Sequence, residues 1–245
     1  MTERDRLYET LVSEPGDFVF DERVVRVFPD MINRSVPGYA TVVAMLGMLA
    51  RRYAQADSRL YDLGCSLGAV ALAMRDAVRA PGARILAVDN APEMIRGLRA
   101  RLDEAPADAA APPVEALQQD ILATPIERAS VTVLNFTLQF VPLERRTALL
   151  ARIAAGTLPG GVLLLSEKIR FADPAEQELQ TAWHHAFKRA RGYSDLEIAR
   201  KREALENVLR PETLETHRER LAQAGFTRVC PWFQGFNFVS LVAFR

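Results

Sequence analysis

An acid, two glycines and two small polar residues stand within seven positions of one another in the stretch Asp62-Leu63-Gly64-Cys65-Ser66-Leu67-Gly68. Gly64 lets the backbone turn and approach a ligand without a Cβ atom, and Gly68 lets a following helix pack close to a strand. Ser66 stands where the dinucleotide-binding pattern G-x-G-x-x-G has its second glycine, and the Asp62 carboxylate would serve an anionic phosphate poorly. The stretch therefore favours a cationic or zwitterionic ligand.

Three further polar residues stand at the ends of later apolar runs. Asp89 follows the glycine turn by about 20 residues, where an acid can accept hydrogen bonds from both hydroxyls of a ribose. Asp120 is placed to meet an adenine amino group, with the backbone of Ile121 beside it, and Asn135 ends a further run. Together with the glycine turn, these positions predict a nucleoside site built from four successive strand ends.

Each of these residues also has a purely structural interpretation. The glycine turn is typical of an ordinary connection between a strand and a helix, and Asp89 has the place of a helix N-cap before Ala91-Pro92-Glu93. Asp120 fits a turn, and Asn135 fits a buried hydrogen-bonding group. Taken singly the residues leave both interpretations open, but their joint appearance at successive strand ends favours the ligand site.

The surrounding pattern predicts an α/β fold with a doubly wound, mostly parallel sheet, because apolar runs alternate with segments of helical spacing. The predicted strands are Arg59 to Leu63, Arg84 to Val88, Val131 to Phe136, Val162 to Ser166 and the less apolar Val114 to Asp120. The predicted helices between them are Ala69 to Arg79, Ala91 to Leu102 and Leu143 to Leu158.

Two helical segments and a final strand pair complete the predicted single domain of residues 1–245. Residues 1–57 are expected to form an N-terminal helical cap, with two helices between Asp21 and Tyr53. Residues 172–210 are expected to form an inserted helical lid, broken at Arg191-Gly192-Tyr193, because this stretch is too long for a tight connection. After a last helix, Glu212 to Ala224, the tail predicts two antiparallel strands.

Charge and cysteine content narrow the classes of function. The 31 basic and 31 acidic residues cancel, which argues against a protein that clamps a nucleic-acid backbone. The two cysteines, Cys65 and Cys230, have no metal-ligand spacing and cannot build a disulfide framework. The N-terminus is polar and no segment has about 18 consecutive apolar residues, so a cytoplasmic protein is expected.

The chain resembles class I S-adenosylmethionine-dependent methyltransferases, which have a Rossmann-like fold. The resemblance rests on the stretch from Asp62 to Gly68, on Asp89 and Asp120, and on the Pro159-Gly160-Gly161 turn before a strand. Five longer stretches narrow the resemblance to the carboxy-S-adenosylmethionine synthase family: "FDERVVRVFPDMINRSVPGY", "YDLGCSLGA", "VLNFTLQF", "GYSDLEIARKREALENV" and "ETHRERLAQAGF". They occur in order and are spread over nearly the whole chain.

The resemblance implies an enzyme that converts S-adenosylmethionine and prephenate to carboxy-S-adenosylmethionine and phenylpyruvate. It also implies a homodimer, no metal, no direct contact with nucleic acid, and a product used by a tRNA carboxymethyltransferase that makes 5-oxyacetyluridine at the wobble position. Two other functions stay as alternatives: a small-molecule methyltransferase with the same fold, and a tRNA-binding or scaffolding protein that retains a nucleoside-like ligand.

The same resemblance implies the residues of the site. Tyr39 and Arg202 are expected to have catalytic roles, and Arg202 would bind the added carboxylate, in its own subunit or across an interface. On composition alone, Tyr39 would equally be a packing residue and Arg202 one solvated charge among many. The implied ligand-binding set is Tyr39, Gly64, Cys65, Ser66, Asp89, Asn90, Asp120, Ile121, Asn135 and Arg202.

Three other reactive residues are expected to have structural roles. His184 and His185 are adjacent on a helical segment and so point to different faces, unlike a metal-binding pair four residues apart. Cys65 has no histidine close in sequence to activate it, and its small size in the turn explains it.

Overall fold

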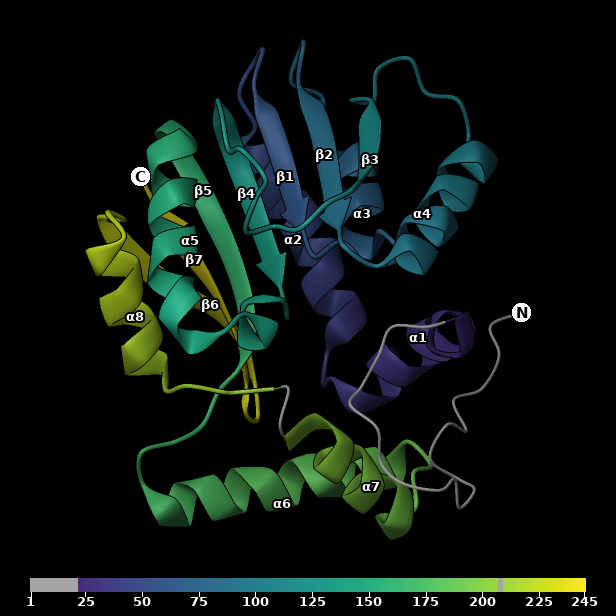
Figure 1. Cartoon of the computed structure of the whole chain (residues 1–245), viewed down its shortest axis with the longest axis vertical. Helices are drawn as coiled ribbons and strands as arrows, with labels where there is room; N and C mark the ends of the chain where they lie inside the picture. The colour runs from purple at the N-terminus through teal and green to yellow at the C-terminus, as the bar shows by residue number, and fades with distance from the viewer. Residues whose placement is uncertain (1–21, 207–208) are drawn as a thin grey trace.

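The computed structural model describes the backbone of residues 22–206 and 209–245 and the side chains of residues 25–200 and 209–245. Its centre is a seven-stranded sheet in the order β3-β2-β1-β4-β5-β7-β6 (Figure 1). The first five strands are parallel, and β7 is antiparallel to both β5 and β6. The strands are β1 Arg59–Leu63, β2 Arg84–Asp89, β3 Val114–Gln118, β4 Ala129–Asn135, β5 Thr157–Lys168, β6 Arg228–Gly235 and β7 Phe238–Phe244.

The predicted α/β architecture and the antiparallel tail are therefore confirmed, but the start of β5 is not where the sequence indicates. The strand begins at Thr157 rather than Val162, so Pro159-Gly160-Gly161 lies inside it instead of forming a turn before it. The pairing between β4 and β5 changes register between Ala129 and Val131, which accommodates the extra residues. A bulge of this kind breaks the strict alternation that marks a strand in sequence.

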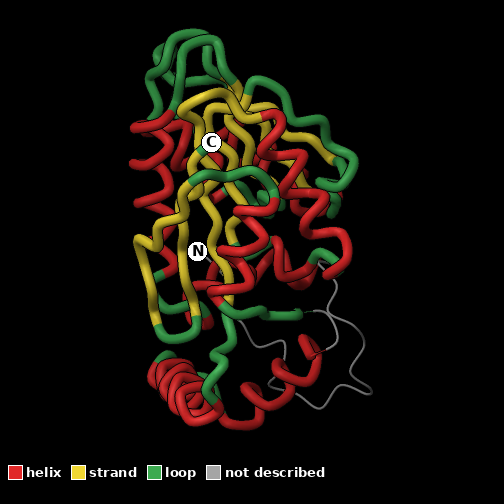
Figure 2. The backbone as a smooth tube through the Cα atoms, turned by 90° about the vertical axis from the view of Figure 1, so that its left-hand side faces the viewer, coloured by secondary structure: helices red, strands yellow, loops and turns green. Residues whose placement is uncertain are grey.

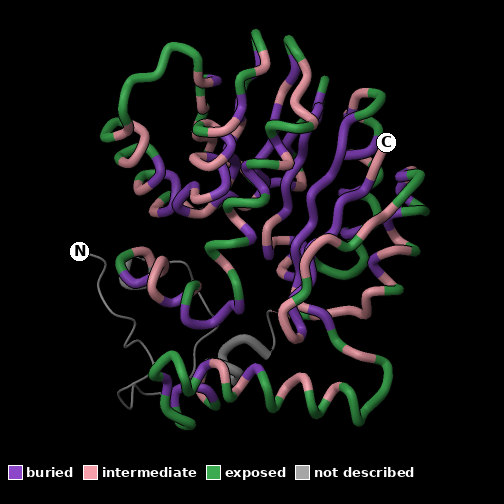
Figure 3. The backbone as a smooth tube through the Cα atoms, turned by 180° about the vertical axis from the view of Figure 1, so that it is seen from behind, coloured by how far each residue is buried: buried purple, intermediate pink, exposed green. Residues whose placement is uncertain are grey.

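Helices cover both faces of the sheet because each buries one apolar side against it. On one face lie α2 Tyr39–Tyr53 and α3 Ala69–Ala77, whose Val42, Leu46 and Met74 are fully buried. On the other lie α5 Leu143–Gly156 and α8 Leu214–Gln223, which bury Leu150 and Leu221. Most of each inner strand is buried (Figure 3).

Three further helices lie near the carboxyl ends of the parallel strands. The arrows of β1, β2 and β4 point toward α1 Glu22–Ser35, and α6 Pro174–Ala190 and α7 Asp195–Glu206 lie beyond them (Figures 1 and 2). The predicted break at Arg191-Gly192-Tyr193 separates α6 from α7. The remaining elements are α4 Pro92–Glu104 and the 3-10 helix η1 Leu138–Phe140. Among the described helices, none is both long and apolar enough to cross a membrane.

Candidate active site

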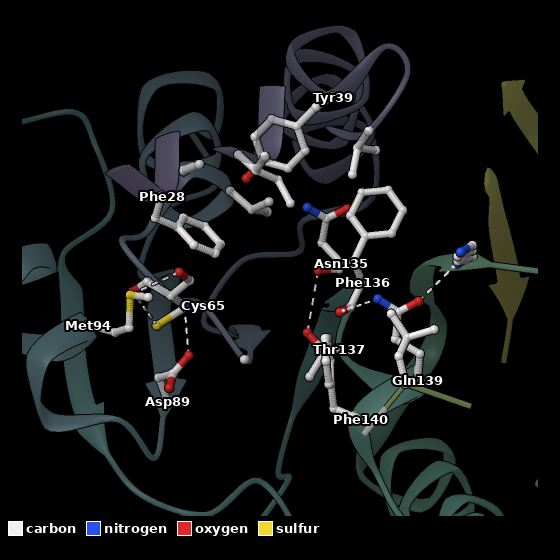
Figure 4. A pocket seen from close by; sticks show the side chains of 18 of the residues that line it. Phe28, Tyr39, Cys65, Asp89, Met94, Asn135, Phe136, Thr137, Gln139 and Phe140 are labelled. Atoms are coloured by element: carbon white, nitrogen blue, oxygen red, sulfur yellow. Dashed lines mark hydrogen bonds between the residues drawn. The ribbon is translucent and has the colours of Figure 1, made fainter. Parts of the chain in front are cut away.

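A cavity of about 410 Å³ opens at the carboxyl ends of the parallel strands (Figure 4). Its walls come from α1, the start of α2, the turn after β1, the ends of β2, β4 and β5, η1 and α6. Nine of the ten predicted ligand-binding residues line it: Tyr39, Gly64, Cys65, Ser66, Asp89, Asn90, Asp120, Ile121 and Asn135. Residues far apart in the sequence therefore meet because parallel strands present their ends at one edge of the sheet.

The turn after β1 requires glycine at two positions, because the backbone there is left-handed and because there is no space for a Cβ atom. Gly64 and Gly68 have φ of +76° and +75°, in the left-handed region. A Cβ on Gly64 would collide with the side chain of Thr137, and one on Gly68 would collide with Leu98. The backbone nitrogens of Gly64 and Cys65 both donate to the Val88 carbonyl, at 2.8 and 2.9 Å. Gly64 thus serves the packing of the cavity wall, a role beside the ligand approach that the sequence predicts for it.

Asp89 links this turn to the start of α4. Its Oδ2 accepts a hydrogen bond from the Ser66 backbone nitrogen at 2.8 Å, and its Oδ1 accepts one from the Ala91 nitrogen at 3.0 Å. The N-cap interpretation is wrong, because the N-cap residue of α4 is Ala91. Burial raises the pKa of Asp89, and the backbone hydrogen bonds oppose that rise. Each oxygen keeps a lone pair, so the carboxylate can still accept from two hydroxyls.

Asp62 lies deeper in the same wall and is almost fully buried. Its Oδ2 accepts a hydrogen bond from the Ala71 backbone nitrogen at 2.9 Å, which fixes the first turn of α3. Burial raises the pKa of Asp62 to about 7, and the charge of Asp89 adds to the effect. The residue therefore holds α3 in place and also places a titratable carboxyl group at the cavity wall.

Asp120 and Asn135 differ in how far the chain satisfies their side chains. Asp120 Oδ1 accepts from the Leu122 nitrogen at 2.8 Å, so the turn interpretation is confirmed, and the residue lines the cavity as well. Asn135 Oδ1 is buried and has no hydrogen-bond partner among the described residues. A buried amide oxygen without a partner costs free energy, so its place at the cavity wall suits a ligand that donates to it.

Tyr39 is the first residue of α2, after Gly38 in the left-handed conformation. Its ring lies 6.4 Å from the Phe136 ring, centroid to centroid, and its side chain points into the cavity (Figure 4). Burial raises the pKa of its hydroxyl, and the negative charge of Asp62 raises it further. Tyr39 thus packs against an aromatic neighbour and keeps a protonated hydroxyl at the cavity.

Proteins with curated names are similar to this chain over nearly its whole length. The carboxy-S-adenosyl-L-methionine synthase of Pseudomonas entomophila is 56% identical over 98% of this chain and 98% of its own length. The Erwinia tasmaniensis protein of the same name is 54% identical over 100% of this chain and 98% of its own. The chain belongs to the carboxy-S-adenosyl-L-methionine synthase family. In addition, residues 60–161 match the model of a methyltransferase domain.

Solved structures show that this chain has the fold of class I S-adenosylmethionine-dependent methyltransferases. Human N-acetylserotonin methyltransferase, solved in complex with SAM, aligns with a TM-score of 0.60 and 17% identity over 91% of this chain and 55% of its own. Magnesium protoporphyrin IX methyltransferase from Synechocystis, also with bound SAM, aligns at 0.56 and 16% over 94% of this chain and 86% of its own. At these identities the likeness concerns the fold.

Arg202, the tenth predicted residue of this family member, lies on α7, but its side chain falls outside the described residues. The prediction that it binds a carboxylate therefore stays a prediction. The backbone of α7 lies beyond the carboxyl ends of the parallel strands, the edge of the sheet at which the cavity opens (Figure 1).

The packing roles expected for His184 and Cys65 agree with their surroundings. His184 Nε2 donates to the Ser35 carbonyl at 2.8 Å, and its ring meets the Phe238 ring edge to face at 5.0 Å. Burial, and then the charge of Lys188, lower the pKa of His184 to about 3. Burial also raises the pKa of the Cys65 thiol, so it is not a thiolate nucleophile. No described group of three or more His, Cys, Asp and Glu residues is arranged to hold a metal ion.

The sequence reasoning missed several residues that line the cavity of this family member. Lys168 is the last residue of β5, and Lys188 and His184 reach the cavity from α6; Phe28 of α1, Met94 of α4 and Gln139 of η1 complete the apolar and polar walls. Lys168 closes the observed strand β5 as Asp89 and Asn135 close β2 and β4, but the sequence interpretation did not reach it. The predicted strand ended at Ser166, two positions too early.

Proposed function

We propose that this chain converts S-adenosylmethionine and prephenate to carboxy-S-adenosylmethionine and phenylpyruvate. The observation that carries the proposal is the identity of 54–56% to proteins named carboxy-S-adenosyl-L-methionine synthase over nearly the full length of both chains. The cavity supports it, because its residues suit a nucleoside that carries an amino acid.

The proposed reaction balances without a further reactant. Prephenate loses its ring carboxylate as carbon dioxide and its ring hydroxyl as hydroxide, the hydroxide takes a proton from the sulfonium methyl group as water, and that methyl carbon bonds to the carbon dioxide. The chain has to hold both substrates in contact and exclude bulk water, since carbon dioxide would otherwise escape.

The described residues divide the binding task along the sheet edge. Asp120 and the Ile121 backbone would bind the adenine, and the Asp89 carboxylate with Asn90 would bind the ribose hydroxyls. The glycine turn would pass under the amino-acid part, with Tyr39 above it. The unsatisfied oxygen of Asn135 gives the best test of fit, because the ammonium of the amino acid would satisfy it.

Arg202 is proposed to bind the added carboxylate through two parallel N–H hydrogen bonds from its guanidinium group. It would do so from its own subunit or from the partner of a homodimer. We further propose that the protein acts in the cytoplasm, without binding nucleic acid itself, and that a tRNA carboxymethyltransferase uses its product to modify wobble uridine.

The decisive experiment incubates the purified protein with S-adenosylmethionine and prephenate and follows both products by mass spectrometry. We expect a nucleoside heavier than S-adenosylmethionine by one carbon dioxide, formed in equal amount to phenylpyruvate. Protein taken directly from cells is expected to carry the same nucleoside. Methyl transfer to a small acceptor with release of S-adenosylhomocysteine, and no carboxylated product, would instead identify a methyltransferase.

Substitution of Arg202 tests its proposed role. Arg202→Ala should lower formation of carboxylated product at least about tenfold, while S-adenosylmethionine binding changes little, because a lost charge-assisted hydrogen bond costs about 1.5–3 kcal/mol. Arg200→Ala, which removes the same charge from the same helix, is the matched control. An equal loss of both nucleosides in Arg202→Ala would contradict the assignment.

A further inference from the structure

Two lysines line the cavity at the end away from Asp120. Lys168 closes β5 and Lys188 lies on α6. The sequence has only three lysines among its 31 basic residues, the third being Lys201. In a chain that uses arginine almost everywhere, two of three lysines thus meet at one cavity.

The Lys168 side chain is placed without a counter-charge. Burial lowers the pKa of its ammonium group, and no hydrogen bond or ion pair joins that group to another described side chain. Its backbone nitrogen donates to Gln139 Oε1 at 3.2 Å, which fixes the end of β5. The neighbouring acid, Glu167, points to the other face of the sheet, where its Oε1 accepts from the Leu138 nitrogen at 2.9 Å.

Both lysines lie close enough to His184 for their charges to act on its ring. The charges of Lys188 and of Lys168 both lower the pKa of this imidazole, in addition to burial. The neutral ring donates to the Ser35 carbonyl and offers the cavity no negative group. An anion entering this end would therefore meet two cations and an uncharged ring.

Charge changes sign along the strand ends. Acids stand at β3, β2 and β1 as Asp120, Asp89 and Asp62, an amide stands at β4 as Asn135, and Lys168 stands at β5. At about 4.8 Å between neighbouring strands, the three steps from β2 to β5 span roughly 14 Å. The acidic end suits a nucleoside with a sulfonium and an ammonium group, and the basic end lies too far away to share the ribose.

We propose that Lys168, assisted by Lys188, binds the carboxylate of prephenate that remains in phenylpyruvate. The inference rests on the proposed function. Prephenate carries two carboxylates, of which the ring carboxylate is transferred, so the retained one needs its own cation. The other carboxylate available in the cavity is the α-carboxylate of S-adenosylmethionine, and the test has to separate these two sources.

Steady-state kinetics of Lys168→Met, with S-adenosylmethionine affinity measured by calorimetry, make that separation. We expect the KM for prephenate to rise about 10- to 100-fold, from the loss of a charge-assisted hydrogen bond, while the Kd for S-adenosylmethionine stays within about twofold. Lys168→Arg should restore part of the loss. Arg170→Met, which removes an exposed charge two residues further along, is the matched control and should behave as wild type.

The alternative outcomes have distinct meanings. A weaker Kd for S-adenosylmethionine with an unchanged KM for prephenate would overturn the inference and assign Lys168 to the α-carboxylate. Unchanged values for both would overturn it and leave Lys168 without a ligand. If wild-type protein forms no phenylpyruvate from prephenate, the proposed function itself fails and the inference falls with it.

Discussion

The two ends of the cavity hold their polar groups in different ways. At β1 and β2 the chain fixes each carboxylate by backbone hydrogen bonds: Asp89 is fixed by Ser66 and Ala91, and Asp62 by Ala71. At β5 the ammonium of Lys168 is half-buried and has no partner among the described side chains. One end is thus preorganised by the chain itself, while the other depends on what binds there.

The two ends also differ in whether their residues belong to the general methyltransferase domain. The fixed end belongs to the part of the chain, residues 60–161, that matches a general methyltransferase domain. Lys168, Lys188 and Arg202 lie beyond that region. The proposed nucleoside site thus belongs to the shared methyltransferase domain, and the groups proposed to bind carboxylates belong to the later segments.

The largest expected effect follows from Asp89→Ala at the fixed end. Removal of the carboxylate deletes its proposed bonds to two ribose hydroxyls and frees the Ser66 and Ala91 nitrogens. The Kd for S-adenosylmethionine should rise by about 100-fold or more, as two charge-assisted hydrogen bonds are lost. Asp108→Ala, at an exposed acid paired with Arg79, is the control, and calorimetry is the measurement. Near-normal affinity in Asp89→Ala would remove the fixed end from the nucleoside site.

A smaller effect, on stability, is expected from adding one methyl group at Gly64, in the fixed end, or at Gly192, in the connection after α6. Gly64→Ala should lower the free energy of unfolding by about 2 kcal/mol or more, because the new Cβ meets Thr137 and the backbone is left-handed. Gly192→Ala, between α6 and α7, has φ of +85° and an exposed position, so about 1 kcal/mol is expected. Urea unfolding measures both.

The Thr137 contact has its own check. Thr137→Ala removes the two atoms nearest to the added Cβ, so it should recover part of the loss in Gly64→Ala and none in Gly192→Ala. An equal loss at the two glycines, with no recovery, would show that the turn at Gly64 is no more tightly packed than the exposed connection at Gly192.

The smallest effect is a pH dependence of opposite sign at the two ends. Asp62 has its pKa raised from 3.8 to about 7, so the folded state holds a proton that the unfolded state releases, and stability falls as pH rises through that interval. His184 has its pKa lowered from 6.5 to about 3, so stability falls as pH drops below 6.5.

Variants at Asp62 and His184 should each remove part of the pH dependence of the free energy of unfolding, in different pH ranges. Asp62→Asn should remove the decline between about pH 4 and 7, and His184→Gln the decline below about pH 6.5. Each change is expected to be about 1 kcal/mol, because water reaching the ionised group reduces its cost. Urea unfolding from pH 4 to 8 measures it; limbs that respond in the same direction would refute the assignment.

The sequence was sufficient for the parts that depend on local pattern. Apolar runs place β1, β2 and β4 nearly to the residue, and the acids and amide at their ends line the cavity at the proposed nucleoside end. It failed at β5, because the irregular segment around Pro159-Gly160-Gly161 breaks the alternation. It also gave no sign that α6 would bring His184 and Lys188 to the cavity, since that depends on how a distant helix packs.

Cys65 shows a last consequence of burial at the fixed end. The proposed substrate is an alkylating agent, and a thiolate in the same cavity would compete for its methyl group and inactivate the protein. Burial and the nearby charges of Asp62 and Asp89 keep this sulfur protonated, and a protonated thiol is a poor nucleophile. The chain thereby protects itself from damage by the molecule it binds.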